Sequence, residues 1–284
     1  MSTVTASTSH SGGSAVRRWV ERIVVALGAV VLVTFILGPL VWLGLRAFAT
    51  SWTYPSLTPN GWTLDWWVAV FSDNKLSKSI VTSLVTAPTV TLVSAVICLP
   101  AAYALARIPF RGRQFVLLTI FATNAFPRFG LYITMASLFY ALNLMSTFLG
   151  VIIVQLIGTI VFMTWIPAAA FAAIPPSLEE AARDAGANRI QVFFRITLRM
   201  ALPAILVALI LSFLAAFDEA QGTFLVGAPD ITTMPIQMYT LVANYPSQVS
   251  AVFSILLSIP SVVLMLAVRR HIMGGAFAQG FRIR

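Results

Sequence analysis

Three ionisable side chains lie inside long apolar stretches of this 284-residue chain. Arg128 is the single charged residue between Gln114 and Leu178, and Asp218 and Glu219 are neighbours in a later stretch. A charge at the centre of a membrane helix costs about 2.5–3.5 kcal/mol on insertion scales, so such a group faces a polar cavity or another charge. The residues admit two interpretations: a structural ion pair between Arg128 and one of the acids, or a polar lining for a solute path.

Two amide side chains extend this polar set. Asn124 lies four residues before Arg128, which places both on one face of a helix, and Gln221 follows the acidic pair closely. We therefore assign the translocation path to Asn124, Arg128, Asp218, Glu219 and Gln221. Carboxylates along this path suit a cationic solute, whereas the arginine repels a simple polycation.

Residue types that support catalysis or metal binding are scarce and scattered. Cys98 is the single cysteine, and His10 and His271 lie near opposite ends of the sequence. A nucleotide-binding P-loop needs a Gly-Lys pair, but Lys75 and Lys78 lie in the stretch DNKLSK. The sequence predicts neither an enzyme nor a metal or cofactor bound by this chain.

The composition is that of a membrane protein. Hydrophobic residues make up 59% of the chain, charged residues 10%, and the mean hydropathy is +0.91; soluble domains carry about 25% charged residues. A span needs about 20 apolar residues, and backbone polar groups in lipid must be satisfied within the segment. We expect an all-α integral membrane protein with six transmembrane helices. Their predicted positions are Ile23–Leu45, Ser79–Ala106, two spans within 114–178 that separate near Asn143, Met200 through the acidic pair to Val226, and about Val249–Val268.

The arginines predict how the spans are oriented. Most of them fall before the first span, between spans two and three, between spans four and five, and after span six. Because basic residues favour the cytoplasmic side, we expect both termini in the cytoplasm. Short basic clusters of this kind do not form a phosphate-tracking surface, so nucleic acid is not an expected partner. Residues 1–18 are expected to be a disordered cytoplasmic tail, and 19–284 a membrane domain.

The cytoplasmic segment between spans four and five has the pattern of two short helices. Pro175-Pro176 ends the fourth span, and Ser177 with Glu180 three residues later predicts a capping box. Gly186 suits the end of this first helix, and Asn188 with Gln191 predicts the start of a second. One face of the first helix carries Leu178, Ala181, Ala182 and Ala185, and the opposite face carries Glu179, Arg183 and Asp184.

The small side chains of this first helix allow close approach of another surface. The helix therefore suits docking into a groove of a partner protein. A segment packed against its own helix bundle is the alternative, and the residues alone leave both open.

The same segment resembles the EAA motif, E-A-A-x3-G-x9-I-x-L-P, of binding-protein-dependent ABC importer permeases. The matching positions are Glu180, Ala181, Ala182, Gly186, Ile196 and Leu198. The proline of the motif is replaced by Arg199, although Leu202-Pro203 follows closely. The stretches GWTLDWW (61–67) and ALARIPFRGR (104–113) also resemble this family.

This resemblance implies a type I importer fold in which the segment forms coupling helices seated on a cytoplasmic ATPase. It assigns ATPase coupling to Glu180, Ala181, Ala182, Arg183, Asp184 and Gly186. The implied partners are an ABC ATPase dimer that uses ATP and Mg, a second and distinct permease subunit, a solute-binding protein and membrane lipid. The implied location is the plasma membrane of a bacterium or archaeon.

Two resemblances bear on the solute. Residues Ser212–Tyr239 look most like the polyamine, opine and phosphonate branch, which we favour, and Phe171–Gly186 look like carbohydrate permeases, the alternative. A secondary transporter is the rival class, but residues 23–140 and 144–268 show no convincing internal repeat. A channel would need a selectivity filter, and no filter-like segment is present.

Overall fold

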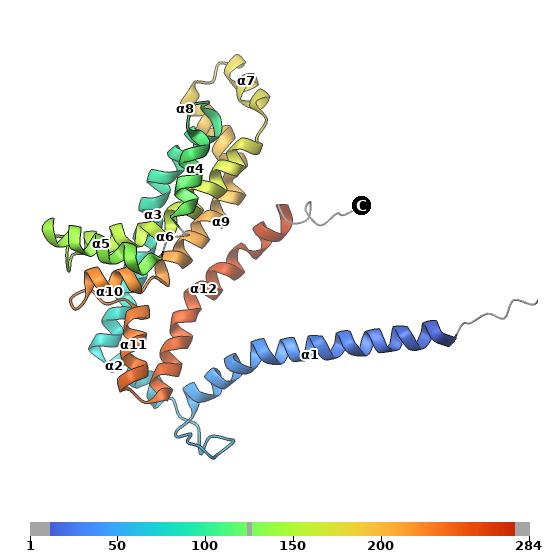
Figure 1. The fold of residues 1–284 in the computed structure, drawn as a ribbon, viewed down its shortest axis with the longest axis vertical. Helices are drawn as coiled ribbons and strands as arrows, with labels where there is room; N and C mark the ends of the chain where they lie inside the picture. Colours follow the sequence, from blue (N-terminus) through green and yellow to red (C-terminus); the bar gives the residue numbers. More distant parts are fainter. Residues whose placement is uncertain (1–11, 124–126, 276–284) are drawn as a thin grey trace, which may run out of the picture. The chain divides into compact units, whose positions relative to one another are not determined.

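The computed structural model describes residues 12–123 and 127–275. Within these ranges the chain forms helices joined by short loops, with one isolated antiparallel bridge between Ala49 and Trp62 and no β-strand (Figure 1). The chain divides into two compact units, residues 1–64 and 65–284. The expected all-α fold is therefore confirmed for the described residues.

The first unit consists of one long helix and an irregular loop. Helix α1 (Gly12–Phe48) contains a candidate membrane span, Trp19–Phe48. The helix begins within the expected tail 1–18, whose first eleven residues lie outside the described residues. In the loop, the Trp52 ring lies 4.1 Å from that of Trp42, and its indole nitrogen donates a hydrogen bond to the Ser56 carbonyl at 3.0 Å.

Three long helices form the centre of the second unit. Helices α3 (Asn74–Arg107), α6 (Phe148–Ala173) and α9 (Leu198–Phe217) pack against one another. Small polar residues join them: the Thr159 hydroxyl donates to the Ser94 hydroxyl at 3.0 Å, and the Ser212 hydroxyl donates to the Thr159 carbonyl at 3.4 Å. Close packing and interhelical hydrogen bonds of this kind hold membrane helices together, because lipid provides no hydrophobic drive between them.

Shorter helices and one further long helix surround this core. They are α2 (Asp65–Ser72), α4 (Arg113–Ala122), α5 (Arg128–Ala141), α10 (Gln221–Gly227), α11 (Met234–Asn244) and α12 (Ser247–Gly275). Within the second unit, α2 and α11 lie at one end, and helices α7 (Pro176–Asp184) and α8 (Arg189–Val192) lie at the other (Figure 1).

Asp73 fixes the start of α3. Its carboxylate accepts the backbone N–H of Lys75 at 2.8 Å and of Leu76 at 3.2 Å, which makes it the N-cap of the helix. The Tyr245 hydroxyl donates to the same carboxylate at 3.0 Å. Because Tyr245 lies in the link between α11 and α12, this carboxylate joins the start of α3 to that link.

Five helices in the described part of the chain are long and apolar enough to cross a membrane, whereas the sequence predicts six spans. The predicted third span is divided into α4 and α5 around residues 124–126, which lie outside the described residues. Pro127 is the N-cap of α5. Proline disfavours helical backbone in the residue before it and cannot donate its own N–H, so a continuous helix through this point is unfavourable.

The predicted end of the fifth span at Val226 is wrong. Helix α9 stops at Phe217, and a new helix, α10, begins at Gln221. The Glu219 side chain accepts backbone N–H groups from the first turn of α10, so it starts a new helix and does not continue the old one. The predicted break near Asn143 is confirmed, since this residue and Ser146 adopt positive φ between α5 and α6.

Candidate functional site

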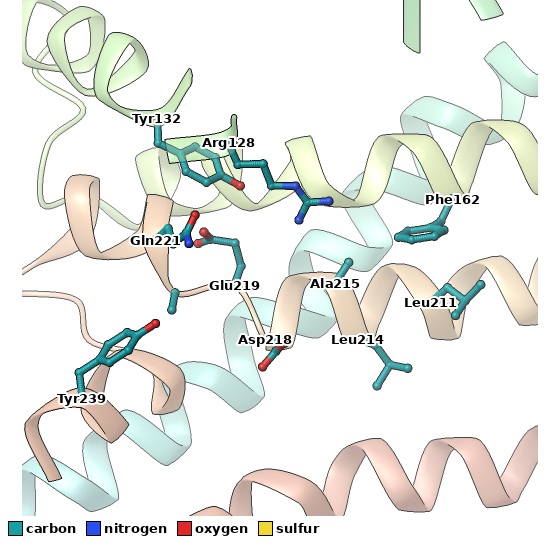
Figure 2. Close-up of a pocket in the computed structure, with 11 residues that line it drawn as sticks. Arg128, Tyr132, Phe162, Leu211, Leu214, Ala215, Asp218, Glu219, Gln221 and Tyr239 are labelled. Carbon is teal, nitrogen blue, oxygen red and sulfur yellow. The ribbon is translucent and has the colours of Figure 1, made fainter. Parts of the chain in front are cut away.

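The structure brings four of the five predicted path residues to one cavity of about 510 Å³ (Figure 2). Arg128 extends into it from the start of α5, and Asp218, Glu219 and Gln221 line it from the link between α9 and α10. The fifth residue, Asn124, lies outside the described residues. The remaining lining residues are Tyr132, Phe162, Leu211, Leu214, Ala215, Ala220 and Tyr239.

Glu219 is engaged by the protein itself. It is only 8% exposed, and its carboxylate accepts hydrogen bonds from the Gly222 N–H at 2.6 Å, the Thr223 N–H at 2.8 Å and the Thr223 hydroxyl at 2.5 Å. The Gln155 amide of α6 donates to the same Thr223 hydroxyl at 3.0 Å. Negative charge at a helix N-terminus is favourable, so Glu219 stabilises the first turn of α10, and Thr223 joins that turn to α6 through Gln155. The prediction that Glu219 lies within a continuous span is therefore wrong.

Asp218 has different surroundings. It is the C-cap residue of α9, is exposed, and also lines a second cavity together with Leu257, Ser258 and Ser261 of α12. No described residue donates a hydrogen bond to its carboxylate. A negative charge at a helix C-terminus gains nothing from the helix dipole, so this carboxylate is available to an external donor or cation.

Aromatic residues of the cavity were not part of the sequence prediction. The Tyr132 hydroxyl is buried and has no hydrogen-bond partner among the described residues. A Cβ added at Gly222 would lie 2.9 Å from the Tyr132 ring and would clash with Val154, so glycine permits this close approach. Tyr132 follows Arg128 by four residues, and that helical spacing was the signal available in the sequence.

The segment predicted to couple to an ATPase forms α7 (Pro176–Asp184), α8 (Arg189–Val192) and a π-helical turn, η1 (Phe193–Thr197). The predicted Ser177–Glu180 capping box is wrong, because Pro175 is the N-cap of α7 and no side chain caps it. Proline is pre-organised for the first helical position, so Pro176 starts the helix two residues earlier than a cap at Ser177 would.

The other two boundary predictions in this segment are confirmed. Gly186 has φ +89°, and its N–H donates to the Arg183 carbonyl at 2.9 Å while the Ala187 N–H donates to the Ala182 carbonyl at 3.0 Å, which is a Schellman motif. Asn188 and Gln191 form the predicted capping box. The second helix is not separate, however, because α8 and η1 continue into α9 as one candidate span, 189–217.

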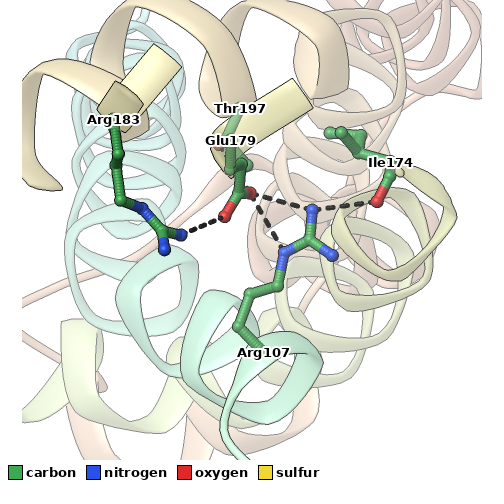
Figure 3. A network of polar contacts seen from close by, with 5 residues as sticks. All are labelled: Arg107, Ile174, Glu179, Arg183 and Thr197. Carbon is green, nitrogen blue, oxygen red and sulfur yellow. Dashed lines mark hydrogen bonds and ion pairs between the residues drawn. The ribbon is translucent and has the colours of Figure 1, made fainter. Parts of the chain in front are cut away.

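The predicted docking face of α7 is exposed, but one residue assigned to the opposite face is not. Leu178, Glu180 and Ala181 are exposed, and Ala182 is half-buried. Glu179 is the one buried residue of α7, and its carboxylate contacts Arg107, Arg183 and Thr197 (Figure 3). Helical spacing could not reveal this, because Arg107 precedes Glu179 by 72 residues.

Comparisons with known proteins agree with the motif. The model of the family described as binding-protein-dependent transport system inner membrane component matches residues 97–274. The trehalose/maltose transport system permease protein of Thermococcus litoralis is 28% identical over 271 residues, covering 91% of this chain and 96% of that protein. The sulfoquinovosyl glycerol transport system permease protein of Agrobacterium fabrum is 27% identical, covering 90% and 92%.

The fold is also similar to that of a solved transporter. A chain of a bacterial ABC transporter involved in the import of the acidic polysaccharide alginate superposes with a TM-score of 0.71 at 20% sequence identity, covering 94% of this chain and 99% of that one. The present chain therefore belongs to the binding-protein-dependent transport family and is a multi-pass inner-membrane permease of an ABC importer.

Proposed function

We propose that this chain forms half of the membrane pore of a carbohydrate importer. The other half is a second, distinct permease subunit, an ABC ATPase dimer supplies the energy from ATP and Mg, and an extracytoplasmic binding protein delivers the sugar. Two observations carry this proposal: the family match, and relatives named for trehalose/maltose and sulfoquinovosyl glycerol transport.

The relatives favour the carbohydrate alternative over the polyamine or opine solute that we preferred from the sequence. The cavity supports the same choice. Glu219 is occupied in capping α10, so Asp218 is the carboxylate left for a solute, and Arg128 lies in the same cavity. Aromatic rings with a few polar groups are typical of small-molecule sites, and a sugar offers both apolar faces and hydroxyls to such a lining.

The proposed topology has six crossings, both termini and α7 on the cytoplasmic side, and α7 seated on the ATPase. At 1.5 Å per residue, the ten residues of α4 span about 15 Å, about half of the hydrocarbon core of a bilayer. We therefore assign the third crossing to α4 and α5 together. The exposed small residues of α7 and the arginines at this end of the second unit support the orientation.

Isolation of the complex in a mild detergent tests the proposed solute and partners together. We expect an ABC ATPase, a second permease and a solute-binding protein to co-purify with this chain. Mass spectrometry of the solute retained by the binding protein should identify a mono- or oligosaccharide. A polyamine or opine in the binding protein would overturn the proposed substrate class, and isolation of the chain without any ATPase would overturn the importer mechanism.

A further inference from the structure

A buried carboxylate joins the coupling segment to the membrane helices. The side chain of Glu179 is 4% exposed, and its Oε1 atom lies 2.8 Å from Nη2 and 3.1 Å from Nε of Arg107. The Thr197 hydroxyl donates to the same oxygen at 2.8 Å, and Arg183 Nη2 lies 3.5 Å from Oε2 (Figure 3). Arg107 in turn donates to the Ile174 carbonyl at 3.0 Å.

These contacts come from the ends of three membrane helices. Arg107 is the last residue of α3, Ile174 is the C-cap of α6, and Thr197 is the last residue of η1, directly before α9. Glu179 belongs to α7, outside all three. Glu179 therefore contacts α3 through Arg107 and the start of α9 through Thr197, and Arg107 extends the network to the end of α6.

An apolar cluster lies beside this network. The Tyr103 ring of α3 lies 4.9 Å from Phe193 and 5.6 Å from Phe171, centroid to centroid, and Phe171 and Ile174 are buried in the same cluster. Ion pairs are screened less in such surroundings than at a surface, and removing one partner of a buried pair leaves an uncompensated charge. Breaking the link between α7 and the core would therefore leave a charge unpaired in apolar surroundings.

Few other side chains of α7 hold it in place. Glu179 is the one buried residue of this helix, and the surface predicted to dock faces outward. A displacement of α7 thus reaches the core through Glu179 and through the two chain connections at Pro175 and Gly186. We infer that Glu179 and Arg107 are positioning residues that transmit the movement of the docked coupling segment to α3, α6 and α9, an inference that rests on the proposed function.

The test uses the complex purified with its own ATPase, reconstituted with the binding protein and the solute that this protein retained from the cell. ATP hydrolysis is measured with and without the loaded binding protein. In Glu179→Gln we expect assembly and basal ATP hydrolysis to be preserved, and the rise in hydrolysis caused by the loaded binding protein to fall about tenfold. A factor of ten corresponds to about 1.4 kcal/mol, which is the scale of a charge-assisted hydrogen bond. Glu21→Gln, which alters an exposed acid of α1 in a surface pair with Arg17, is the matched control.

A double variant separates transmission from folding. Glu179→Gln strands the Arg107 charge, whereas Glu179→Gln with Arg107→Gln removes both charges, so the double variant should recover any lost protein. We expect the recovered double variant to remain uncoupled. Wild-type stimulation in the single variant, or its return in the double variant, would overturn the inference and leave the proposed function intact. Absence of stimulation in the wild-type complex would instead contradict the proposed function.

Discussion

At the scale of single residues, two neighbouring acids have opposite surroundings. Both oxygens of Glu219 accept hydrogen bonds from α10, whereas Asp218 is exposed at the end of α9 and lines the cavity with Arg128. Sequence adjacency therefore does not imply a shared role. Glu219 holds the local structure, and we propose that Asp218 contacts the solute.

Two matched substitutions test this division. Glu219→Gln replaces an oxygen that accepts hydrogen bonds with an amide that donates, which leaves buried donors unpaired and costs about 1–3 kcal/mol. We expect less folded protein in the membrane. Asp218→Asn should leave the amount of protein unchanged and reduce ATP-dependent solute uptake, with both quantities measured on the same membranes. Reduced abundance in Asp218→Asn, with normal uptake per molecule, would contradict the assignment.

The surroundings of the Asp73 carboxyl predict that the stability of the folded protein depends on pH. Burial raises the pKa of the Asp73 carboxyl, but hydrogen bonds from the Leu76 and Lys75 backbone and the Tyr245 hydroxyl outweigh it and hold the pKa below its ordinary 3.8. A carboxyl whose folded pKa is lowered contributes stability at pH values above its unfolded pKa, and that contribution is lost as the pH falls through the folded pKa.

We expect the thermal unfolding midpoint of the purified protein to drop between about pH 4 and pH 2 partly through this group. Asp73→Asn keeps an N-cap acceptor but cannot titrate, so the difference between wild type and this variant should shrink as the pH falls. Asp73→Ala removes the cap and should cost about 0.5–2 kcal/mol near neutral pH. If the difference in unfolding midpoint between wild type and Asp73→Asn stayed constant with pH, the charge of Asp73 would have no role in stability.

At the scale of elements, α7 combines an inward anchor with an outward surface. Glu179 faces the core, and Glu180 and Ala181 are exposed on the helix. This arrangement is compatible with both interpretations of the segment, packing on its own bundle and docking into a partner. Helix α7 packs on the bundle through one side chain and leaves its small-residue face exposed.

Charge reversal on the outward surface should interrupt coupling without unfolding the protein. We expect Glu180→Lys to reach the membrane in normal amounts and to lose solute uptake, because Glu180 is exposed and makes no cap that folding depends on. Glu21→Lys introduces the same charge change on exposed α1 and should retain uptake. Normal uptake by Glu180→Lys would remove this residue from the docking surface.

The sequence predicted correctly those helix ends that depend only on residues close together in the chain. Gly186 and the Asn188–Gln191 box fixed helix ends as expected, since both act within a few residues. The predictions that were wrong failed for one of two reasons: a neighbouring residue had a stronger local preference, or a contact distant in sequence decided the outcome. Pro176 displaced the predicted cap at Ser177, and Glu179 is buried because Arg107, far away in sequence, neutralises it.

The candidate site was predictable only in part. The charged and amide residues were found because charge is rare in apolar segments, and the cavity brings four of them together. The distinct roles of Asp218 and Glu219 depend on where α9 ends, which hydropathy does not report. The rings of Tyr132, Phe162 and Tyr239 escaped detection because aromatic residues are common throughout this chain.

For the whole molecule, the orientation of the chain decides which surface would meet the proposed ATPase and which the proposed binding protein. We expect the segment 47–78 to face outward and α7 to face the cytoplasm. Asn60→Cys, in a Cys98→Ala background, should react with an impermeant thiol reagent on intact cells, because Asn60 is exposed.

Ser177→Cys in the same background is the matched control, because Ser177 is exposed on α7. It should react only after the membrane is permeabilised. Reversal of this pattern, with Ser177→Cys labelled on intact cells, would invert the topology and separate α7 from any cytoplasmic ATPase.

We propose that this chain moves its solute across the membrane by coupling to ATP hydrolysis in another subunit. Uptake of the radiolabelled solute retained by the binding protein, measured in proteoliposomes that contain the whole complex, tests it most directly. We expect accumulation of the solute to require enclosed ATP with Mg and the external binding protein, and to persist when ion gradients are collapsed. Accumulation driven by an ion gradient without ATP, as in a secondary transporter, would contradict it.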